Sequence, residues 1–171
     1  MEYVILVDEN DRELGTMEKM RAHEAGLLHR AFSVFIFDPE GRLLIHRRAD
    51  EKYHCGGLWT NTCCSHPRPG EDVKLAAERR LREEMGINCT LQPAFTFVYK
   101  AVFDNGLTEH EFDHVLVGFS GEQPKPDPAE VSAWKWVSPA EALSETGANP
   151  AGFTPWFRLS LAKVLNWTSR L

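Results

Sequence analysis

The chain has 171 residues, 43 % of them hydrophobic and 26 % charged, and a formal net charge of −6. This length and balance are typical of a single folded domain, 1–171, and exclude a disordered chain. The acidic balance argues against nucleic acid as a partner, because attraction to phosphates needs a basic surface. The first apolar run, 4–7, is too short for a secretory signal or a membrane span, and the four cysteines show no C-x-x-C spacing. We therefore expect a cytoplasmic protein with reduced thiols, no membrane partner, and a monomeric or weakly dimeric state.

Hydrophobic periodicity and turn residues predict strands and helices that follow one another along the chain. Strands are predicted at 4–7, 31–37 and 43–47, and near 95–103, 112–119 and 131–137. Helices are predicted around 17–22, at 72–85, from 138 onward and at 155–167, and a loop broken at Gly26 follows the first of them. This order favours an α+β fold, a mixed β-sheet flanked by helices.

The segment 59–67, Trp-Thr-Asn-Thr-Cys-Cys-Ser-His-Pro, brings a thiol close to an imidazole. Cys64 lies two residues before His66, in a loop that leads into the carboxylate-rich helix at 72–85. A second segment carries Glu109 and Glu111, and side chains at i and i+2 of a strand point to the same face. A thiol, a metal ligand and carboxylates packed so closely in sequence indicate an assembled active site.

The end of that helix, 79–87, together with Glu71 resembles the Nudix signature. In the Nudix family this loop and helix hold a divalent cation against a diphosphate, and Mg²⁺ suits the task because it combines one or two carboxylates with phosphate oxygens and water. The resemblance is incomplete, since Ser65 stands where a glycine is usual and Arg80 where a metal-binding glutamate is usual. This pattern favours a helix that binds a diphosphate without cleaving it. The simpler interpretation is a solvated helix with an Arg80–Glu84 ion pair.

Three segments together resemble the type I isopentenyl-diphosphate isomerase family: Trp59-Thr60-Asn61, Cys64-Ser65-His66-Pro67 and Glu109-x-Glu111. The resemblance extends from Glu18-Lys19 to Trp156-Phe157, nearly the whole chain. It implies the Nudix fold, in which helices cover both faces of the mixed sheet as an α/β/α sandwich. It also implies metal-dependent, reversible conversion of isopentenyl diphosphate to dimethylallyl diphosphate, small-molecule diphosphates of isoprenoid biosynthesis.

The resemblance further implies a metal site and a diphosphate site. The metal ligands would be three histidines and two glutamates: His23, His29, His66, Glu109 and Glu111. Imidazole and carboxylate suit Mn²⁺, Mg²⁺ or Zn²⁺ alike, so these residue types do not select the ion. The diphosphate would be held by Lys19, Arg48, Lys52 and Arg80, and Glu84 would reach a Mg²⁺ bound to the substrate. Taken singly, each of these residues is more often a surface or hydrogen-bonded side chain.

The same resemblance places Cys64 and Glu111 on opposite faces of the substrate. Glu111, aided by Tyr99, would protonate the terminal double bond, and the Cys64 thiolate would remove a proton from carbon 2. The carbocation between these steps needs a dry site with π faces, which Trp156 and, to a lesser degree, Trp59 would provide. Because a free thiol has a pKa of about 8.5, Cys64 needs positive charge nearby, which the metal site at His66 would supply.

Some of these residues also have purely structural interpretations. Cys64 could be a small buried hydrophobe and Trp156 a core residue of the last helix. Cys63 is expected to be structural, and four histidines match no role: His46, His54, His110 and His114.

Three departures from the family pattern concern the edges of the site. His23 and His29 are one residue closer than in bacterial members, which requires a different connecting loop. The segment 54–57, His-Cys-Gly-Gly, replaces a more usual aromatic residue and proline, which predicts a looser pocket edge. Ser65 would strain its loop if that position required a positive φ.

Two other functions are compatible with parts of the sequence. A Nudix hydrolase of a nucleoside diphosphate derivative would share the signature helix, but Arg80 and the thiol beside His66 argue against it. A non-catalytic module that binds a metabolite would keep the fold, but the complete set of acid, base and metal positions argues against that function.

Overall fold

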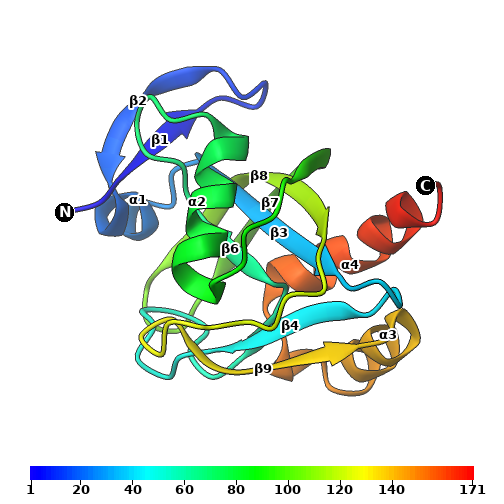
Figure 1. Cartoon of the computed structure of the whole chain (residues 1–171). Helices are drawn as coiled ribbons and strands as arrows, with labels where there is room; N and C mark the ends of the chain where they lie inside the picture. Colours follow the sequence, from blue (N-terminus) through cyan, green and yellow to red (C-terminus); the bar gives the residue numbers. More distant parts are fainter.

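The computed structural model describes residues 1–171 as one mixed nine-stranded sheet with four α-helices (Figure 1). The strands are β1 (Tyr3–Val7), β2 (Glu13–Glu18), β3 (His29–Phe37), β4 (Leu43–Arg48), β5 (Trp59–Thr60), β6 (Cys63–Ser65), β7 (Gln92–Val102), β8 (Thr108–Phe119) and β9 (Val131–Val137). The helices are α1 (Lys19–Ala25), α2 (Val73–Met85), α3 (Pro139–Ala148) and α4 (Pro155–Thr168), with a 3₁₀ turn at Pro150–Gly152. None of these helices combines the length and the apolar character that crossing a membrane requires.

Strand β3 organises the sheet because it pairs along both of its edges. It runs parallel to β8 over its full length, from the His29–Glu111 pair to the Phe37–Phe119 pair. It also pairs antiparallel with β6, where Ser33 lies opposite Cys64. The register therefore brings the thiol segment and the two-glutamate segment, far apart in sequence, to strands on either side of β3.

Alternate side chains of β3 enter two separate cores. Val34 and Ile36 pack with Leu81 of α2 in one cluster of buried apolar residues. Phe35 stacks on Phe157 of α4 in the other, with 6.0 Å between the ring centres. Because successive side chains of a strand point to opposite faces, the two clusters lie on opposite faces of the sheet. The predicted α+β architecture, with helices on both faces of a mixed sheet, is confirmed.

Helix α2 has the ends that its sequence predicts. The side chain of Asp72 caps its N-terminus by accepting a hydrogen bond of 3.0 Å from the backbone N–H of Leu75. Gly86 ends it with a left-handed φ of 67°, and a Cβ there would lie 2.8 Å from the carbonyl oxygen of Lys125. The helix predicted at 72–85 is therefore confirmed, with Asp72 as its cap.

Helix α1 ends in the same left-handed conformation at Gly26, with a φ of 68°. Glycine adopts this conformation without the steric cost that a Cβ brings, so the chain can turn sharply at both positions. At Gly26 the turn leads directly from α1 into β3. One glycine turn therefore accommodates the connection between His23 and His29, which is one residue shorter than the spacing expected from bacterial family members.

The N-terminal part differs from the prediction of a helix around 17–22. Residues 13–18 form β2, which pairs with β1, and the helix begins only at Lys19. Glu18 caps it instead of belonging to it, since its side chain accepts hydrogen bonds from the backbone N–H groups of Met20 and Arg21. Pairing with β1 outweighs the local helical pattern of residues 16–18. A second difference is that the segment 59–67, predicted as a loop, contains the short strands β5 and β6.

Candidate active site

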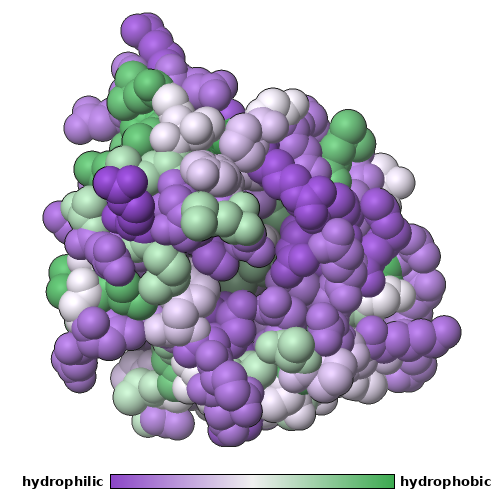
Figure 2. Space-filling view, turned by 90° about the vertical axis from the view of Figure 1, so that its left-hand side faces the viewer, coloured by the Kyte–Doolittle hydropathy of each residue, from purple (hydrophilic) through white to green (hydrophobic).

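A polar cavity opens beside β3, β6 and β8, and most of its lining side chains are ionisable or aromatic. They are Glu2, Lys19, Phe32, Arg48, Lys52, Tyr53, His54, Cys64, Ser65, His66, Arg80, Glu84, Glu109, Glu111, Glu130 and Trp156. Figure 2 shows a hollow near the middle of one face of the molecule, bordered in large part by hydrophilic residues. Every predicted site residue lines the cavity except Trp59, His23, His29 and Tyr99, and the last three contact Glu109 or Glu111 from behind it.

Five side chains form a cluster whose composition suits a divalent cation. They are His23 from α1, His29 from β3, His66 after β6, and Glu109 and Glu111 from β8, and their ligand atoms all lie within 4.8 Å of one another. Nε2 of His66 lies 2.7 Å from Oε2 of Glu111, and Nε2 of His29 lies 3.3 Å from the same oxygen. The predicted ligands are therefore assembled at one point.

Two imidazoles turn the lone pair of Nε2 toward this cluster. Nδ1 of His23 is 2.6 Å from the carbonyl oxygen of Lys19, and Nδ1 of His29 is 2.9 Å from that of Leu27. A carbonyl oxygen only accepts, so each neutral ring carries its proton on Nδ1. Both Nε2 atoms are buried without a hydrogen-bond partner. A buried polar atom without a partner is costly, and a bound cation would satisfy both.

Both glutamates of the cluster are held in the ionised form. Burial raises the pKa of Glu109, but its contacts with His23 and His54 outweigh burial and keep the pKa well below the ordinary value. Burial and the charge of Glu109 raise the pKa of Glu111, whereas the histidines beside it lower the pKa overall. Ionised carboxylates next to imidazole lone pairs are a donor set for a divalent metal ion.

Tyr99 of β7 completes the surroundings of Glu111. It lies directly opposite Glu111 in the β7–β8 ladder, and its hydroxyl donates a hydrogen bond to Oε1 of that glutamate. The same hydroxyl is 3.3 Å from Oε2 of Glu109. Burial and the two carboxylates raise the pKa of Tyr99 well above its ordinary value, so the phenol keeps its proton. Glu111 thus uses Oε2 toward the histidines and Oε1 toward a proton donor.

Cys64 on β6 faces the cavity with a guanidinium beside it. Its Sγ lies 3.8 Å from Nη1 of Arg48. Cζ of the same guanidinium lies 5.3 Å from the ring centre of Trp156. Burial raises the pKa of Cys64 to about 12, although Arg48 opposes that rise. Positive charge at the thiol therefore comes from Arg48 in this structure, in addition to the expected metal site at His66.

Cys63 and Ser65, the neighbours of Cys64 in sequence, are placed differently. Cys63 is fully buried in the core beneath α2, and its Sγ donates to Oε2 of Glu84 over 3.4 Å. Ser65 pairs with Phe32 in the sheet and has no positive φ, so serine causes no strain where a glycine is usual. The concern that serine would strain this position is therefore not met.

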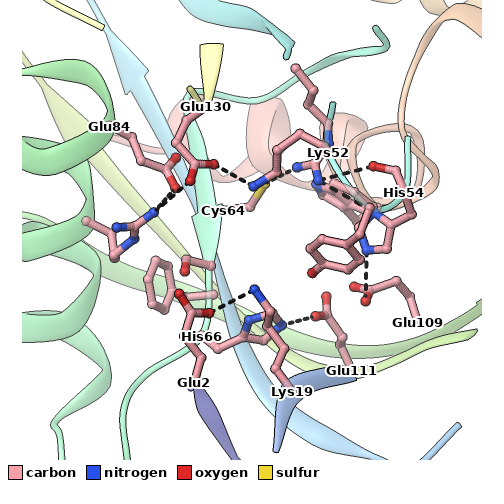
Figure 3. A pocket seen from close by; sticks show the side chains of 16 residues that line it. Glu2, Lys19, Lys52, His54, Cys64, His66, Glu84, Glu109, Glu111 and Glu130 are labelled. Carbon is pink, nitrogen blue, oxygen red and sulfur yellow. Dashed lines mark hydrogen bonds and ion pairs between the residues drawn. The ribbon is translucent and has the colours of Figure 1, made fainter. Parts of the chain in front are cut away.

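Three of the four cations expected at the diphosphate already have carboxylate partners (Figure 3). Lys19 pairs with Glu2 at 2.8 Å and Lys52 with Glu130 at 2.5 Å. Arg80 contacts Glu84, whose pKa is raised by burial in spite of that cation. The four cations converge on one cavity, as the resemblance implies.

Sequence reasoning missed several residues of this cavity. Glu2 and Glu130 lie in irregular segments where no periodicity points to them, and Tyr53 and His54 lie in the loop between β4 and β5. The expectation that Trp59 would offer a second π face to the carbocation is wrong. Trp59 is absent from the lining, packs against the core beneath α4 and lies under the ammonium of Lys135.

The loop at 54–57 is compact, and the expectation of a pocket edge looser than in other family members stays a prediction. The backbone N–H of Arg48 donates to the carbonyl of Leu58 over 2.9 Å, and that of Gly57 donates to the carbonyl of Arg48 over 3.0 Å. A Cβ on Gly56 would lie only 2.5 Å from the carbonyl oxygen of Asp50. The glycines allow a close approach of two backbone segments, which closes the turn.

Comparison with known proteins agrees with this geometry. The NUDIX domain family matches residues 27–157. The isopentenyl-diphosphate Delta-isomerase of Burkholderia multivorans is 51 % identical over 99 % of this chain and 99 % of its own length. This chain belongs to the isopentenyl-diphosphate isomerases of the Nudix family. The isopentenyl-diphosphate Delta-isomerase 2 of Aromatoleum aromaticum is also 51 % identical, over 97 % of this chain and 88 % of its own length.

Solved structures show the same fold at lower identity. The DR0079 protein of Deinococcus radiodurans has a TM-score of 0.78 at 22 % identity, covering 95 % of this chain and 98 % of that protein. The MutT protein of Methanosarcina mazei has a TM-score of 0.67 at 19 % identity, covering 80 % of this chain and 91 % of that protein. The predicted Nudix fold is confirmed.

Proposed function

We propose that this protein interconverts isopentenyl diphosphate and dimethylallyl diphosphate, with Cys64 and Glu111 exchanging protons with the five-carbon chain. The observation that carries the proposal is the placement of this thiol and this carboxylate on the same cavity, from strands on either side of β3 (Figure 3). Relatives of about half identical sequence, named for this reaction, support the choice of substrate.

We assign the five-residue cluster to one divalent cation, Mn²⁺, Mg²⁺ or Zn²⁺, and Glu84 to a Mg²⁺ that arrives with the diphosphate. The buried, unpartnered Nε2 atoms of His23 and His29, which face the two glutamates, support the first assignment. When bound, such a cation supplies positive charge that stabilises the ionised carboxylates and lowers the pKa of acidic groups around it. The second assignment rests on Glu84 lying at the cavity wall among the cations expected to hold the diphosphate.

The reaction adds one proton to the chain and removes another. Because Glu111 favours the ionised form at rest, it must first take up a proton, which the hydroxyl of Tyr99 at its Oε1 can pass to it. Glu111 then protonates the terminal carbon of the double bond, and positive charge develops on the tertiary carbon. Cys64 then accepts a proton from carbon 2, and the new double bond forms between carbons 2 and 3. Since burial raises the pKa of Cys64, the guanidinium of Arg48 must stabilise the thiolate. In the reverse direction the two groups exchange roles.

Replacing Trp156 by leucine should lower kcat by about 2- to 30-fold, because an aromatic face stabilises a nearby cation by about 0.5–2 kcal/mol. Trp156 is buried and lines the cavity, whereas Trp59 does not. Trp59→Leu is the matched control, and it should lower thermal stability without changing kcat. Steady-state kinetics of both variants would contradict this role of Trp156 if Trp156→Leu kept the kcat of the wild type.

Hydrolysis of a nucleoside diphosphate derivative is the main alternative. Arg80 lies on α2 where hydrolases carry a metal-binding glutamate, and its guanidinium contacts Glu83 and Glu84 and lies 3.8 Å from Glu130. A guanidinium among these carboxylates reduces the negative charge available to metal ions that would assist cleavage. This arrangement favours diphosphate binding over cleavage.

Incubation with isopentenyl diphosphate in heavy water would test the proposed function. We expect dimethylallyl diphosphate that carries deuterium on a methyl group derived from carbon 4, detected by NMR and mass spectrometry. Release of phosphate or pyrophosphate from a panel of nucleotides, without isomerisation, would favour the hydrolase instead. Tight binding of isopentenyl diphosphate without any deuterium exchange would favour a non-catalytic module.

A further inference from the structure

His54 is a buried imidazole to which the proposed reaction gives no role. It lies in the loop between β4 and β5 and is 6 % exposed. Its ring packs between those of Phe103 and Trp156, with 5.1 and 5.7 Å between ring centres. The two ring nitrogens, the polar atoms of the side chain, both approach groups of the active site.

The two ring nitrogens connect the cluster of metal ligands with the cation beside the thiol (Figure 3). Nε2 lies 3.0 Å from Oε1 of Glu109, the same oxygen that contacts Nε2 of His23. On the opposite side of the ring, Nδ1 lies 3.5 Å from Nη2 of Arg48. The same Nη2 donates to the carbonyl oxygen of His54 over 3.3 Å. His54 therefore lies between Glu109 and Arg48.

These contacts determine which nitrogen of His54 carries the proton. A guanidinium has only donors, so Nδ1 of His54 must accept and Nε2 must carry the hydrogen, which then points to Glu109. His23 and His29 have the opposite arrangement, since their Nδ1 atoms donate to backbone carbonyls and their Nε2 lone pairs face the cluster. A ring whose Nε2 bears a proton donates to a ligand oxygen and does not itself bind the metal.

We infer that His54 is a positioning residue that holds Glu109 in the orientation needed to bind the divalent cation and ties this carboxylate to Arg48. The inference rests on the metal site of the proposed function. Partners that orient metal ligands in this way typically change metal affinity by about 10- to 100-fold. His54 acts on the metal site through a hydrogen bond to Glu109, without entering the coordination shell.

The affinity of the protein for Mn²⁺ alone, measured by competition with a chelator, would test this role without any turnover. His54→Leu should weaken Mn²⁺ binding by about 10- to 100-fold. His54→Gln should stay within a few-fold of the wild type, because its side-chain NH₂ can replace the Nε2 donor. His110→Gln is the matched control: His110 lies between the two glutamates in sequence but outside the cavity lining, and its Nδ1 contacts the carbonyl of Gly26 at 3.1 Å.

A double-mutant comparison separates positioning from general damage to the core. If His54 acts through Glu109, His54→Leu should cost little further Mn²⁺ affinity in a Glu109→Gln background. An equal loss in both backgrounds would overturn the inference, as would wild-type affinity in the single variant His54→Leu. A wild-type protein that binds no Mn²⁺ would overturn the proposed metal site itself, which is a different outcome.

The tautomer of His54 can be measured even if His54→Leu does not fold. Long-range ¹H–¹⁵N NMR spectra of the wild-type protein should show a protonated Nε2 on His54 and a protonated Nδ1 on His23 and His29. An unprotonated Nε2 on neutral His54 would overturn the inference. The expected pattern would support it independently of any substitution.

Discussion

Replacing Cys64 by alanine should lower kcat by about 10²- to 10⁴-fold, the range for loss of a positioned acid–base group. The thiol faces the cavity beside Arg48, and we propose no other group there that could exchange a proton at carbon 2. Three of the cations that we assign to the diphosphate, Lys19, Lys52 and Arg80, come from other segments and remain in place. The dissociation constant for isopentenyl diphosphate, measured by calorimetry, should therefore stay within a few-fold of the wild type.

Cys89→Ala is the matched control for this experiment. Cys89 is also a free, partly buried thiol, but it is absent from the cavity lining. We expect wild-type kinetics from this variant. Turnover by Cys64→Ala within a few-fold of the wild type would contradict the proposed mechanism, because the thiol would then not be one of the two proton-exchanging groups.

Isotope exchange by Cys64→Ala would also identify the carbon at which the thiol acts. If Glu111 protonates carbon 4 and Cys64 acts at carbon 2, the variant can still form the carbocation from isopentenyl diphosphate but cannot complete the reaction. Recovered isopentenyl diphosphate should then gain deuterium at carbon 4 in heavy water, while dimethylallyl diphosphate should gain none. Deuterium at carbon 2 of recovered dimethylallyl diphosphate, with none in isopentenyl diphosphate, would reverse the assignment of the two groups.

Much of the fold was predictable because its central element has a clear pattern. The run at 31–37 is β-branched and aromatic, as expected of a strand covered on both faces, and the structure places it at the centre of the sheet. The predictions of secondary structure were wrong where pairing with another strand decides the local conformation. Residues 16–18 join β2 because β1 is available to pair with them, and two-residue β5 is too short to show any periodicity.

The candidate site, like the fold, was predictable from the sequence only in part. Its metal-ligand set was predictable from family resemblance, and the structure brings those five side chains together. The neighbours that set their chemistry were not predictable. His54 reaches Glu109 through the fold of an irregular loop, and Glu130 reaches Lys52 from a segment 78 residues further along the chain. Such contacts depend on tertiary geometry, which leaves no periodic pattern in the sequence.

Replacing Glu111 by glutamine should also lower kcat by about 10²- to 10⁴-fold, because the amide cannot exchange a proton with the terminal carbon. Asp113→Asn is the matched control, since Asp113 lies two residues further along the same face of β8 and is equally buried. Its Oδ2 accepts a hydrogen bond of 2.7 Å from Ser33, and burial and Glu111 raise its pKa well above the ordinary value. Asparagine keeps an oxygen that can accept from Ser33, and Asp113 is absent from both the cluster of ligands and the cavity lining, so this control should keep turnover within a few-fold of the wild type.

Comparison with Glu109→Gln separates the two functions that we assign to Glu111. Both glutamates belong to the cluster of ligands, so both substitutions should weaken Mn²⁺ binding. Only Glu111 is expected to carry the transferred proton, since the hydroxyl of Tyr99 makes its shorter hydrogen bond to Oε1 of Glu111 and its longer one, 3.3 Å, to Oε2 of Glu109. Saturating Mn²⁺ should therefore restore much of the activity of Glu109→Gln and leave Glu111→Gln inactive. Equal restoration of both variants would mean that Glu111 serves the metal alone, and the proton donor would then have to be another group on this cavity.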